Sequence, residues 1–362
     1  MSPAENAVGR GGPEGVRPDS EATPGSAGGR RPGRRRKGRA DRSMVPDAEF
    51  TSYYGRPIVK ASPWEADIPA YFFAGGLAAG SSIIAAGADV TGRGVLRRTG
   101  RLGALGALGF SMVALVHDLG KPSRFVNMMR VAKLTSPMSV GTWILTAYSP
   151  FAMAAAGAEV VGMLPARWHR GPLRLVPYVE RPAGLLAALF APPVAAYTAV
   201  LLSDTATPSW HSAYKELPFV FVSSALAASS GLGLVAAPLH ENLPARRLAL
   251  GAAVVELAME RQMESSMGMT AEPLHHGKAG RLMGAAKALT VAGAAGSLLA
   301  GRSRTLGVLS GAALMGGSLC TRFGIFEAGQ ESARDPRYTV VPQRERLERE
   351  GPVRYSEADK DN

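Results

Sequence analysis

Long apolar segments without charged side chains dominate the chain between residues 64 and 330, whereas residues 1–63 contain hardly any apolar cluster. The first segment, Ile68 to Ala88, has 21 residues and no charge. At a rise of about 1.5 Å per residue, such a helix covers the roughly 30 Å of hydrocarbon in a bilayer. The pattern therefore predicts an integral membrane protein rather than a soluble one.

Seven further segments continue this pattern and predict about eight transmembrane helices in all. They are Leu102–Val116, Met138–Ala158, Pro182–Ser203, Leu217–Leu239, Leu248–Val255, Leu282–Gly301 and Thr305–Thr321, the last three being the least apolar or the shortest. The prolines at 192 and 193 are expected to break the fourth helix. Small residues such as Gly76 and Gly80, four apart on one face, allow close helix contact. We expect an all-α membrane protein packed as two four-helix groups.

The flanking regions differ sharply from this transmembrane domain, which we place at residues 64–330. Residues 1–60 carry 12 Lys or Arg against 7 Asp or Glu, and residues 29–39 form an Arg-rich run. We expect residues 1–63 to be a disordered, solvated tail, and residues 331–362 to be a second polar tail. Binding of the run to anionic lipid or nucleic acid is the alternative, and we expect no nucleic-acid partner.

The few cysteine and histidine residues limit which cofactors this chain can hold. Cys320 is the single cysteine, which excludes disulfides and any cluster held by several thiolates. A haem b needs two histidines that face each other from different helices. Of the six histidines, only His117 and His240 adjoin apolar segments, and they fall on opposite faces of the membrane. We expect neither haem nor an iron–sulfur cluster on this chain.

The stretch from His117 to Tyr148, which begins with a polar connector and runs into the third apolar segment, contains the candidate chemistry. Its basic residues Arg124, Arg130 and Lys133 alternate with Phe, Met and Val at a spacing that suits a short helix on a bilayer surface. His117 and Asp118 begin the connector and can exchange protons. Asp67 and Tyr71, four residues apart, face the same side of the membrane at the start of the first helix. The purely structural alternative is that Asp118 caps a helix and pairs with Arg124.

Three stretches resemble the NrfD-like family of polysulfide reductase membrane subunits. The first and most specific is HDLGKPSRFVNMMRVAKLTSPMSVGTWIL, residues 117–145; the others are YFFAGGLAAG, residues 71–80, and TRFGIFEAG, residues 321–329. The resemblance extends over about residues 64–343. One departure is Lys121, where the family pattern has Arg, so that the charge is kept but the two-pronged hydrogen bonding is lost.

The resemblance implies a membrane anchor subunit that exchanges electrons between quinone and an iron–sulfur partner. The implied partners, besides membrane lipid, are a ferredoxin-like subunit with 4Fe–4S clusters and a molybdopterin catalytic subunit, for which formate dehydrogenase is one candidate. The expected location is the cell membrane and the expected quinone is menaquinone. The residues predicted to line the quinone site are Asp67, Tyr71, His117, Asp118, Arg124 and Asn127.

Two charged residues fall within or beside the less apolar segments, Glu256 and Lys287. A charge inside a bilayer is costly unless it is paired, so we predict that these two form an ion pair between the sixth and seventh helices. Polar residues on interrupted helices would also suit a secondary transporter with a site at the middle of the membrane, which is the alternative function. A transporter should show interruptions at matching positions in two halves of the chain, and the sequence shows none.

Overall fold

The computed structural model describes residues 57–119, 121, 123–165 and 174–350, and the regular elements in that part of the chain are all helical. The long helices are α1 (Asp67–Val90), α2 (Gly94–Asp118), α4 (Pro137–Gly162), α5 (Val176–Ser203), α7 (Leu217–Ala236), α8 (Leu243–Met267), α9 (Gly277–Leu299) and α10 (Arg304–Arg334). The shorter ones are α3 (Arg124–Met129), α6 (Pro208–Ser212), the 3₁₀ helix η5 (Gly268–Leu274) and α11 (Arg337–Glu350). The Arg-rich run lies outside the described residues.

Seven of the long helices are apolar enough to cross a membrane, and α8 alone among the eight is not. The charged residues of α8 lower its hydropathy, yet two of them, Glu256 and Glu260, are buried inside the protein. Its exposed side carries apolar residues such as Val254, which is 66% exposed. The chain is thus a multi-pass membrane protein, and seven of its eight long helices are long and apolar enough to span a bilayer.

Large apolar side chains are exposed on the outer sides of the helices, as a bilayer environment requires. They include Phe110, Val113, Met153, Leu189, Val254 and Leu309. The buried positions, by contrast, include many Ser, Thr, Glu and Arg side chains. In water such an apolar surface would favour association, whereas in a bilayer it contacts the acyl chains of the lipids.

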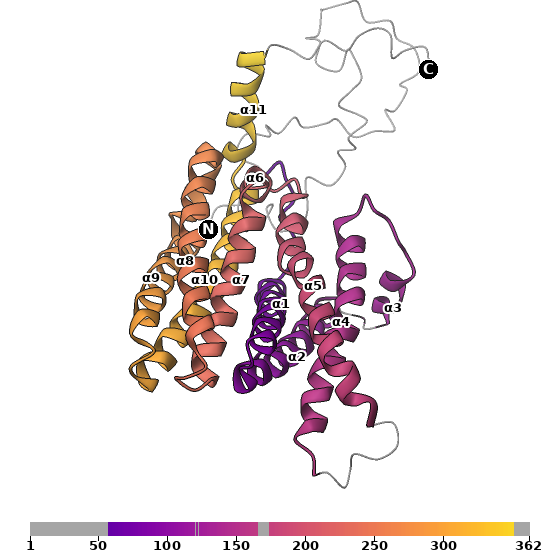
Figure 1. Ribbon diagram of the computed structural model, residues 1–362. Coiled ribbons are helices and arrows are strands. Elements are labelled where there is room, and N and C mark those ends of the chain that lie inside the picture. The colour runs from indigo at the N-terminus through magenta and orange to yellow at the C-terminus, as the bar shows by residue number, and fades with distance from the viewer. Residues whose placement is uncertain (1–56, 120, 122, 166–173, 351–362) are drawn as a thin grey trace, which may run out of the picture. The chain divides into compact units, whose positions relative to one another are not determined.

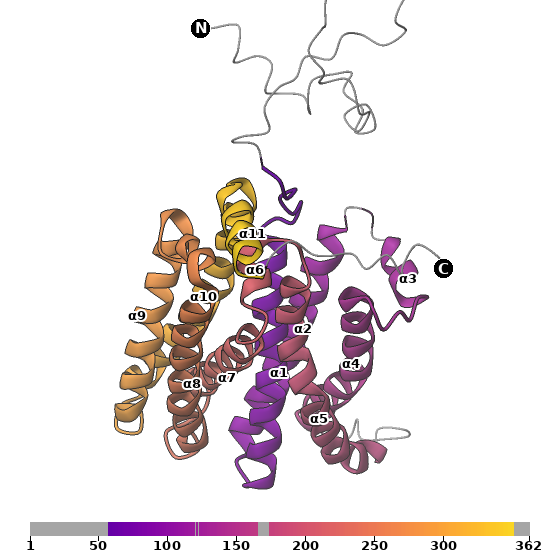
Figure 2. The same ribbon diagram turned by 90° about the horizontal axis from the view of Figure 1, so that it is seen from above.

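The eight long helices pack as two groups of four, as predicted. One group contains α1, α2, α4 and α5, and the other contains α7, α8, α9 and α10. Figure 1 shows the second group on one side and α4 and α5 on the other, with α1 between them. The view from above in Figure 2 shows the same arrangement. Helix α7 joins the groups, because it packs against both α1 and α5.

The glycines of α1 allow the two groups to approach closely. A Cβ added to Gly80 would lie 2.7 Å from the backbone oxygen of Ala225 in α7, and it would also meet the side chain of Ser229. A Cβ on Gly76 would lie 3.1 Å from the Cβ of Ala225. The small-residue face predicted from sequence is therefore the contact surface between α1 and α7.

Helix α2 begins eight residues earlier than predicted because its arginines are neutralised. Arg101 Nη1 lies 2.6 Å from Glu180 Oε1 and 3.1 Å from Glu159 Oε1, and Arg97 Nε lies 2.7 Å from Glu159 Oε1. Asp89 of α1 adds a fifth member, 3.3 Å from Arg97. This ion cluster fastens α1, α2, α4 and α5 at the end of the group opposite His117, and it extends α2 through residues that sequence analysis assigned to a loop.

Two other helices differ from the prediction. Helix α5 runs unbroken through Pro192 and Pro193, contrary to the expected break. Helix α10 extends from Arg304 to Arg334 and so crosses residue 330, where we placed the end of the transmembrane domain. The amide of Gln330 near its end donates to the backbone oxygen of Ser62, 3.0 Å away. This contact joins the end of α10 to the segment that precedes α1.

Candidate functional site

An exposed histidine–carboxylate pair joins the ends of α1 and α2. His117 Nδ1 lies 2.8 Å from Asp67 Oδ2, with the two side chains 77% and 37% exposed. The two helices run in opposite directions, so the first turn of α1 meets the last turn of α2. A carboxylate at a helix start and an imidazole at a helix end both complement the helix dipoles. The pair is thus held in place by the helix termini and remains accessible from outside.

The other predicted site residues lie around this pair in different ways. Asp118 ends α2 and is half-buried, but the imidazole of His117 is hydrogen-bonded to Asp67 rather than to Asp118. Asn127 lies on α3 and is exposed, and its backbone oxygen accepts from the N–H of Arg130 at 3.2 Å. Arg124 begins α3, but the position of its side chain lies outside the described residues.

Tyr71 lies one turn deeper on α1 than Asp67 and is buried. Its ring meets the ring of Tyr197 from α5 edge-on, with centroids 6.5 Å apart. The Tyr197 hydroxyl is buried and has no hydrogen-bond partner among the described residues. Sequence analysis missed Tyr197, which lies in the middle of an apolar segment without any local signal. The two tyrosines place phenol groups inside the first helix group, below the exposed pair.

Helix α3 and the chain after it are fastened to α4 by hydrogen bonds to one backbone oxygen. The oxygen of Val131 accepts from the Ser139 hydroxyl at 2.8 Å and from the Trp143 indole N–H at 3.2 Å. The Ser136 hydroxyl caps α4 by accepting from the Ser139 N–H, and Pro137 occupies the first turn. The polar connector predicted from sequence therefore forms a short helix beside α4, as Figures 1 and 2 show.

An apolar cavity of about 220 Å³ lies between α2 and α4, with Met129 of α3 at its edge. Its walls are Met112, Leu115, Met129, Thr142, Leu145, Thr146, Ser149, Pro150 and Met153. The polar groups among these already bond within the helix, since the Thr142 and Ser149 hydroxyls donate to backbone oxygens one turn earlier. The cavity therefore lies near the end of α2 that carries His117, on the side of α2 that faces α4, whereas His117 faces α1.

The predicted pairing of Glu256 with Lys287 is not the one that the structure forms. Lys287 Nζ lies 2.6 Å from Glu264 Oε1, two helical turns further along α8. Glu256 instead accepts from the Thr321 hydroxyl of α10 at 3.2 Å. Glu256, Glu260 and Glu264 lie on one face of α8, so sequence alone could not decide which of them is level with Lys287.

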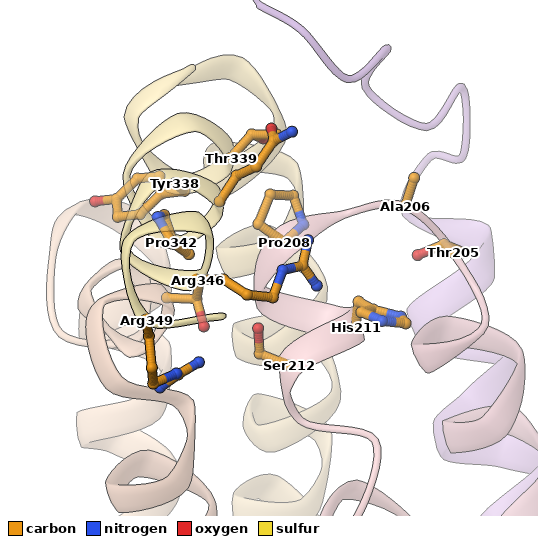
Figure 3. A pocket seen from close by; sticks show the side chains of 12 residues that line it. Thr205, Ala206, Pro208, His211, Ser212, Tyr338, Thr339, Pro342, Arg346 and Arg349 are labelled. Carbon is orange, nitrogen blue, oxygen red and sulfur yellow. The ribbon is translucent and has the colours of Figure 1, made fainter. Parts of the chain in front are cut away.

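A second cavity, which is polar and has a volume of about 380 Å³, lies between α6, η5 and α11 at the end of the protein that carries His117. Figure 3 shows His211 of α6 and the arginines Arg346 and Arg349 of α11 around it. Helix α11 is fastened to η5 because the Tyr338 hydroxyl donates to Glu272 Oε2 at 2.9 Å. Burial raises the pKa of the Tyr338 phenol, as does its bond to the Glu272 carboxylate. Sequence analysis placed α11 in a polar tail and gave no sign of the cavity.

The comparison with protein families agrees with this architecture. The family model for polysulphide reductase NrfD matches residues 58–246, more than half of the chain. The matched part includes two of the stretches that carried the resemblance, residues 71–80 and 117–145, and ends within α8; residues 321–329 lie beyond it. No curated protein matches the chain. The chain belongs to the NrfD polysulphide reductase family, and it is a membrane subunit of the oxidoreductase-complex type.

Proposed function

We propose that the chain exchanges electrons and protons between the quinone pool and an iron–sulfur partner subunit, at a quinone site around His117. The observation that carries the proposal is the exposed His117–Asp67 pair, 2.8 Å apart where α1 begins and α2 ends, together with an apolar cavity that lies between the end of α2 and α4. Membership of the family supports the same role. The site would take the headgroup of a lipid-soluble quinone, menaquinone being the expected one.

The pair has the chemistry that a quinone carbonyl requires. Reduction of a quinone consumes two electrons and two protons, so a proton donor must stand beside each carbonyl oxygen. An imidazole titrates near neutral pH and can both give up and recover a proton. Asp67 bonds to Nδ1 of His117, which fixes the ring and leaves Nε2 for the quinone oxygen. Asp118 lies next to His117 in sequence and can pass protons to it from water.

Tyr71 and Tyr197 extend this proposal toward the interior of the protein. Both phenols lie within the first helix group, and the Tyr197 hydroxyl lacks a partner among the described residues. A quinone oxygen directed inward would accept a hydrogen bond from a phenol, while the opposite oxygen meets His117. Arg124 and Asn127 of α3 would cover the polar edge of the headgroup. The isoprenoid tail would lie along the apolar cavity between α2 and α4.

The electrons must come from a partner subunit, because Cys320 is the single cysteine of the chain. We propose that the partner is a ferredoxin-like subunit with 4Fe–4S clusters, and that it links this chain to a molybdopterin catalytic subunit. The end of the protein that carries His117 also carries α11 and the polar cavity beside it, because Trp210 of α6 stacks on Trp64 just before α1, with ring centroids 6.0 Å apart. This end is the one that we expect the iron–sulfur subunit to cover.

The experiment is to measure turnover of the assembled complex with a water-soluble quinone and, separately, with an artificial electron carrier that reacts at the partner subunit. His117→Ala and Asp67→Asn should each lower quinone-coupled turnover by about 10²-fold, the usual scale for a positioned acid–base group. Turnover with the artificial carrier should be unchanged. Tyr71→Phe should lower quinone turnover as well if the headgroup reaches the interior phenols.

His240→Ala is the matched control. His240 is also an exposed histidine beside a carboxylate, 3.9 Å from Glu241, but it lies between α7 and α8 at the opposite end of the protein. Its loss should leave both activities unchanged. Full quinone turnover in His117→Ala and Asp67→Asn, in complexes that contain every subunit, would place the quinone site elsewhere.

A further inference from the structure

Three glutamates form a line along the inner face of α8, from one end of the protein toward its middle. Glu264 lies near the end of α8 with 19% of its side chain exposed, whereas Glu260 and Glu256 are 2% and 1% exposed. They are spaced by four residues, so successive carboxyls are about 6 Å apart along the helix axis. The exposed member lies at the end that carries His117. The N–H of Leu96 at the start of α2 donates to Glu241 just before α8, so the two helices begin at one end of the protein and end at the other.

A fully buried arginine of α10 lies close enough to the two inner carboxyls to act on them electrostatically. Arg322 is 0% exposed, and its Nη2 donates to the backbone oxygen of Phe221 in α7 at 2.6 Å. Its guanidinium also lies over the Phe221 ring, 3.8 Å from the centroid. The remaining nitrogens, Nε and Nη1, have no hydrogen-bond partner among the described residues. The guanidinium is thus anchored at one edge with two nitrogens unbonded, and its charge is close enough to act on both Glu256 and Glu260.

The inner carboxyls have unsatisfied oxygens of their own. Glu256 Oε1 accepts from the Thr321 hydroxyl, but Oε2 of Glu256 and Oε2 of Glu260 have no partner in the described part of the chain. The Ser224 hydroxyl of α7 lies beside them and donates to Ser318 of α10 at 2.9 Å. Buried polar atoms without a protein partner are commonly bridged by water. The four unbonded atoms of Glu256, Glu260 and Arg322 are groups that bridging water within the α7–α10 group would satisfy.

The charges in this space do not balance if both inner glutamates are ionised. Three carboxylates, Glu256, Glu260 and Glu264, stand against two cations: Arg322, which acts on the two inner ones, and Lys287 of α9, which bonds to Glu264 at 2.6 Å and also acts on Glu260. His275 lies 3.8 Å from the same Glu264 and is half exposed. One surplus negative charge would remain in a region without bulk water, which is strongly unfavourable. A single proton held by the two inner carboxyls removes the surplus.

We propose that Glu256 and Glu260 form a proton-binding site inside the α7–α10 group, loaded from the His117 end of the protein through Glu264. The proton would pass from Glu264 to Glu260 and then to Glu256 by way of bridging water, since the carboxyls are too far apart for direct transfer. Arg322 holds the second carboxyl ionised and ready to accept. This site is separate from the His117–Asp67 pair and does not depend on quinone binding.

A bound metal cation is a poorer occupant of the same space. The oxygens of Glu256 and Glu260 could serve as ligands, but the Arg322 guanidinium beside them repels a second cation. A proton bound to a carboxyl leaves it neutral and makes it a hydrogen-bond donor to the other carboxyl. The facing guanidinium therefore favours a proton over sodium or potassium.

Infrared spectroscopy of the full chain in lipid nanodiscs tests the proposal through the C=O stretch of a protonated carboxylic acid. The unaltered protein should show this band at neutral pH, and it should shift in D₂O. Glu256→Gln and Glu260→Gln should each remove the band. Glu159→Gln should retain it, because Glu159 is equally buried but is ion-paired with Arg97 and Arg101.

A separate variant tests whether protons enter through Glu264. Glu264→Gln should keep the band but slow its shift in D₂O by tenfold or more. A band that is missing in the unaltered protein, or that survives in both inner variants, would overturn the proton site. Loss of the band when sodium is added would overturn it in favour of a cation site. An unchanged exchange rate in Glu264→Gln would overturn the proposed entry.

Discussion

The ion cluster at the start of α2 predicts that Glu159 is one of the most important residues for the stability of the first helix group. Glu159 is 4% exposed and accepts from Arg97 at 2.7 Å and from Arg101 at 3.1 Å. Replacing it with Ala removes both bonds and leaves Arg97 and Arg101 with only Asp89 and Glu180 as partners. The lost carboxylate cannot be replaced by water, because Arg101 is buried.

The expected magnitude follows from the burial of both partners. Hydrogen bonds to charged groups contribute about 1.5–3 kcal/mol each. Breaking a buried ion pair by removing one partner costs roughly 3–5 kcal/mol. We therefore expect Glu159→Ala to lower the free energy of unfolding by about 3–5 kcal/mol, with Glu159→Gln falling between it and the unaltered protein because the amide oxygen still accepts a hydrogen bond.

The assay is thermal unfolding of the chain in detergent or nanodiscs, followed by intrinsic fluorescence and by loss of helical signal. Glu180→Ala is the matched control, since Glu180 belongs to the same cluster but its side chain is 25% exposed and water can replace part of what is lost. Glu159→Ala should lower the unfolding temperature clearly more than Glu180→Ala. Equal shifts in the two variants, or no shift in either, would refute the argument from burial.

Two further predictions concern packing and the apolar cavity. Gly80→Val should destabilise the protein by about 1–3 kcal/mol or more, because a Cβ there meets the backbone of α7, whereas Gly87→Val, with nothing within 4 Å, should be tolerated in the same unfolding assay. Met112→Trp should fill the cavity between α2 and α4 and raise KM for quinone more than it lowers kcat; Val113→Trp, on the lipid-facing side and 69% exposed, should leave both constants unchanged.

Much of the fold could be predicted from sequence, because membrane-spanning helices are recognised by their long runs of apolar residues. The two four-helix groups and the contact face at Gly76 and Gly80 followed from the number of spans and from small-residue spacing. The start of α2 could not be predicted in this way. Arg97 and Arg101 look like loop residues until Glu159 and Glu180, far away in sequence, are found beside them. Charged residues that neutralise one another across helices give no local signal.

The candidate site was predictable only where the order of the helices along the chain determines which residues lie on the same side of the membrane. His117 and Asp67 were expected on the same side of the membrane because one ends the second span and the other begins the first, although the hydrogen bond between them was not foreseen. Tyr197 was missed because only the packing of α5 against α1 brings it to Tyr71. The partner of Lys287 was predicted wrongly. Three glutamates share one face of α8, and the position of α9 along α8 determines which of them lies beside Lys287.

The most direct measurement of the central claim is photolabelling of the assembled complex with an azido-quinone, followed by peptide mapping. The account predicts that the label is found in the peptides that contain the end of α2, α3 and the first half of α4, that excess quinone prevents it, and that Asp67→Asn and His117→Ala reduce it while His240→Ala does not. Competable labelling confined to α7–α10, with none near His117, would contradict the account.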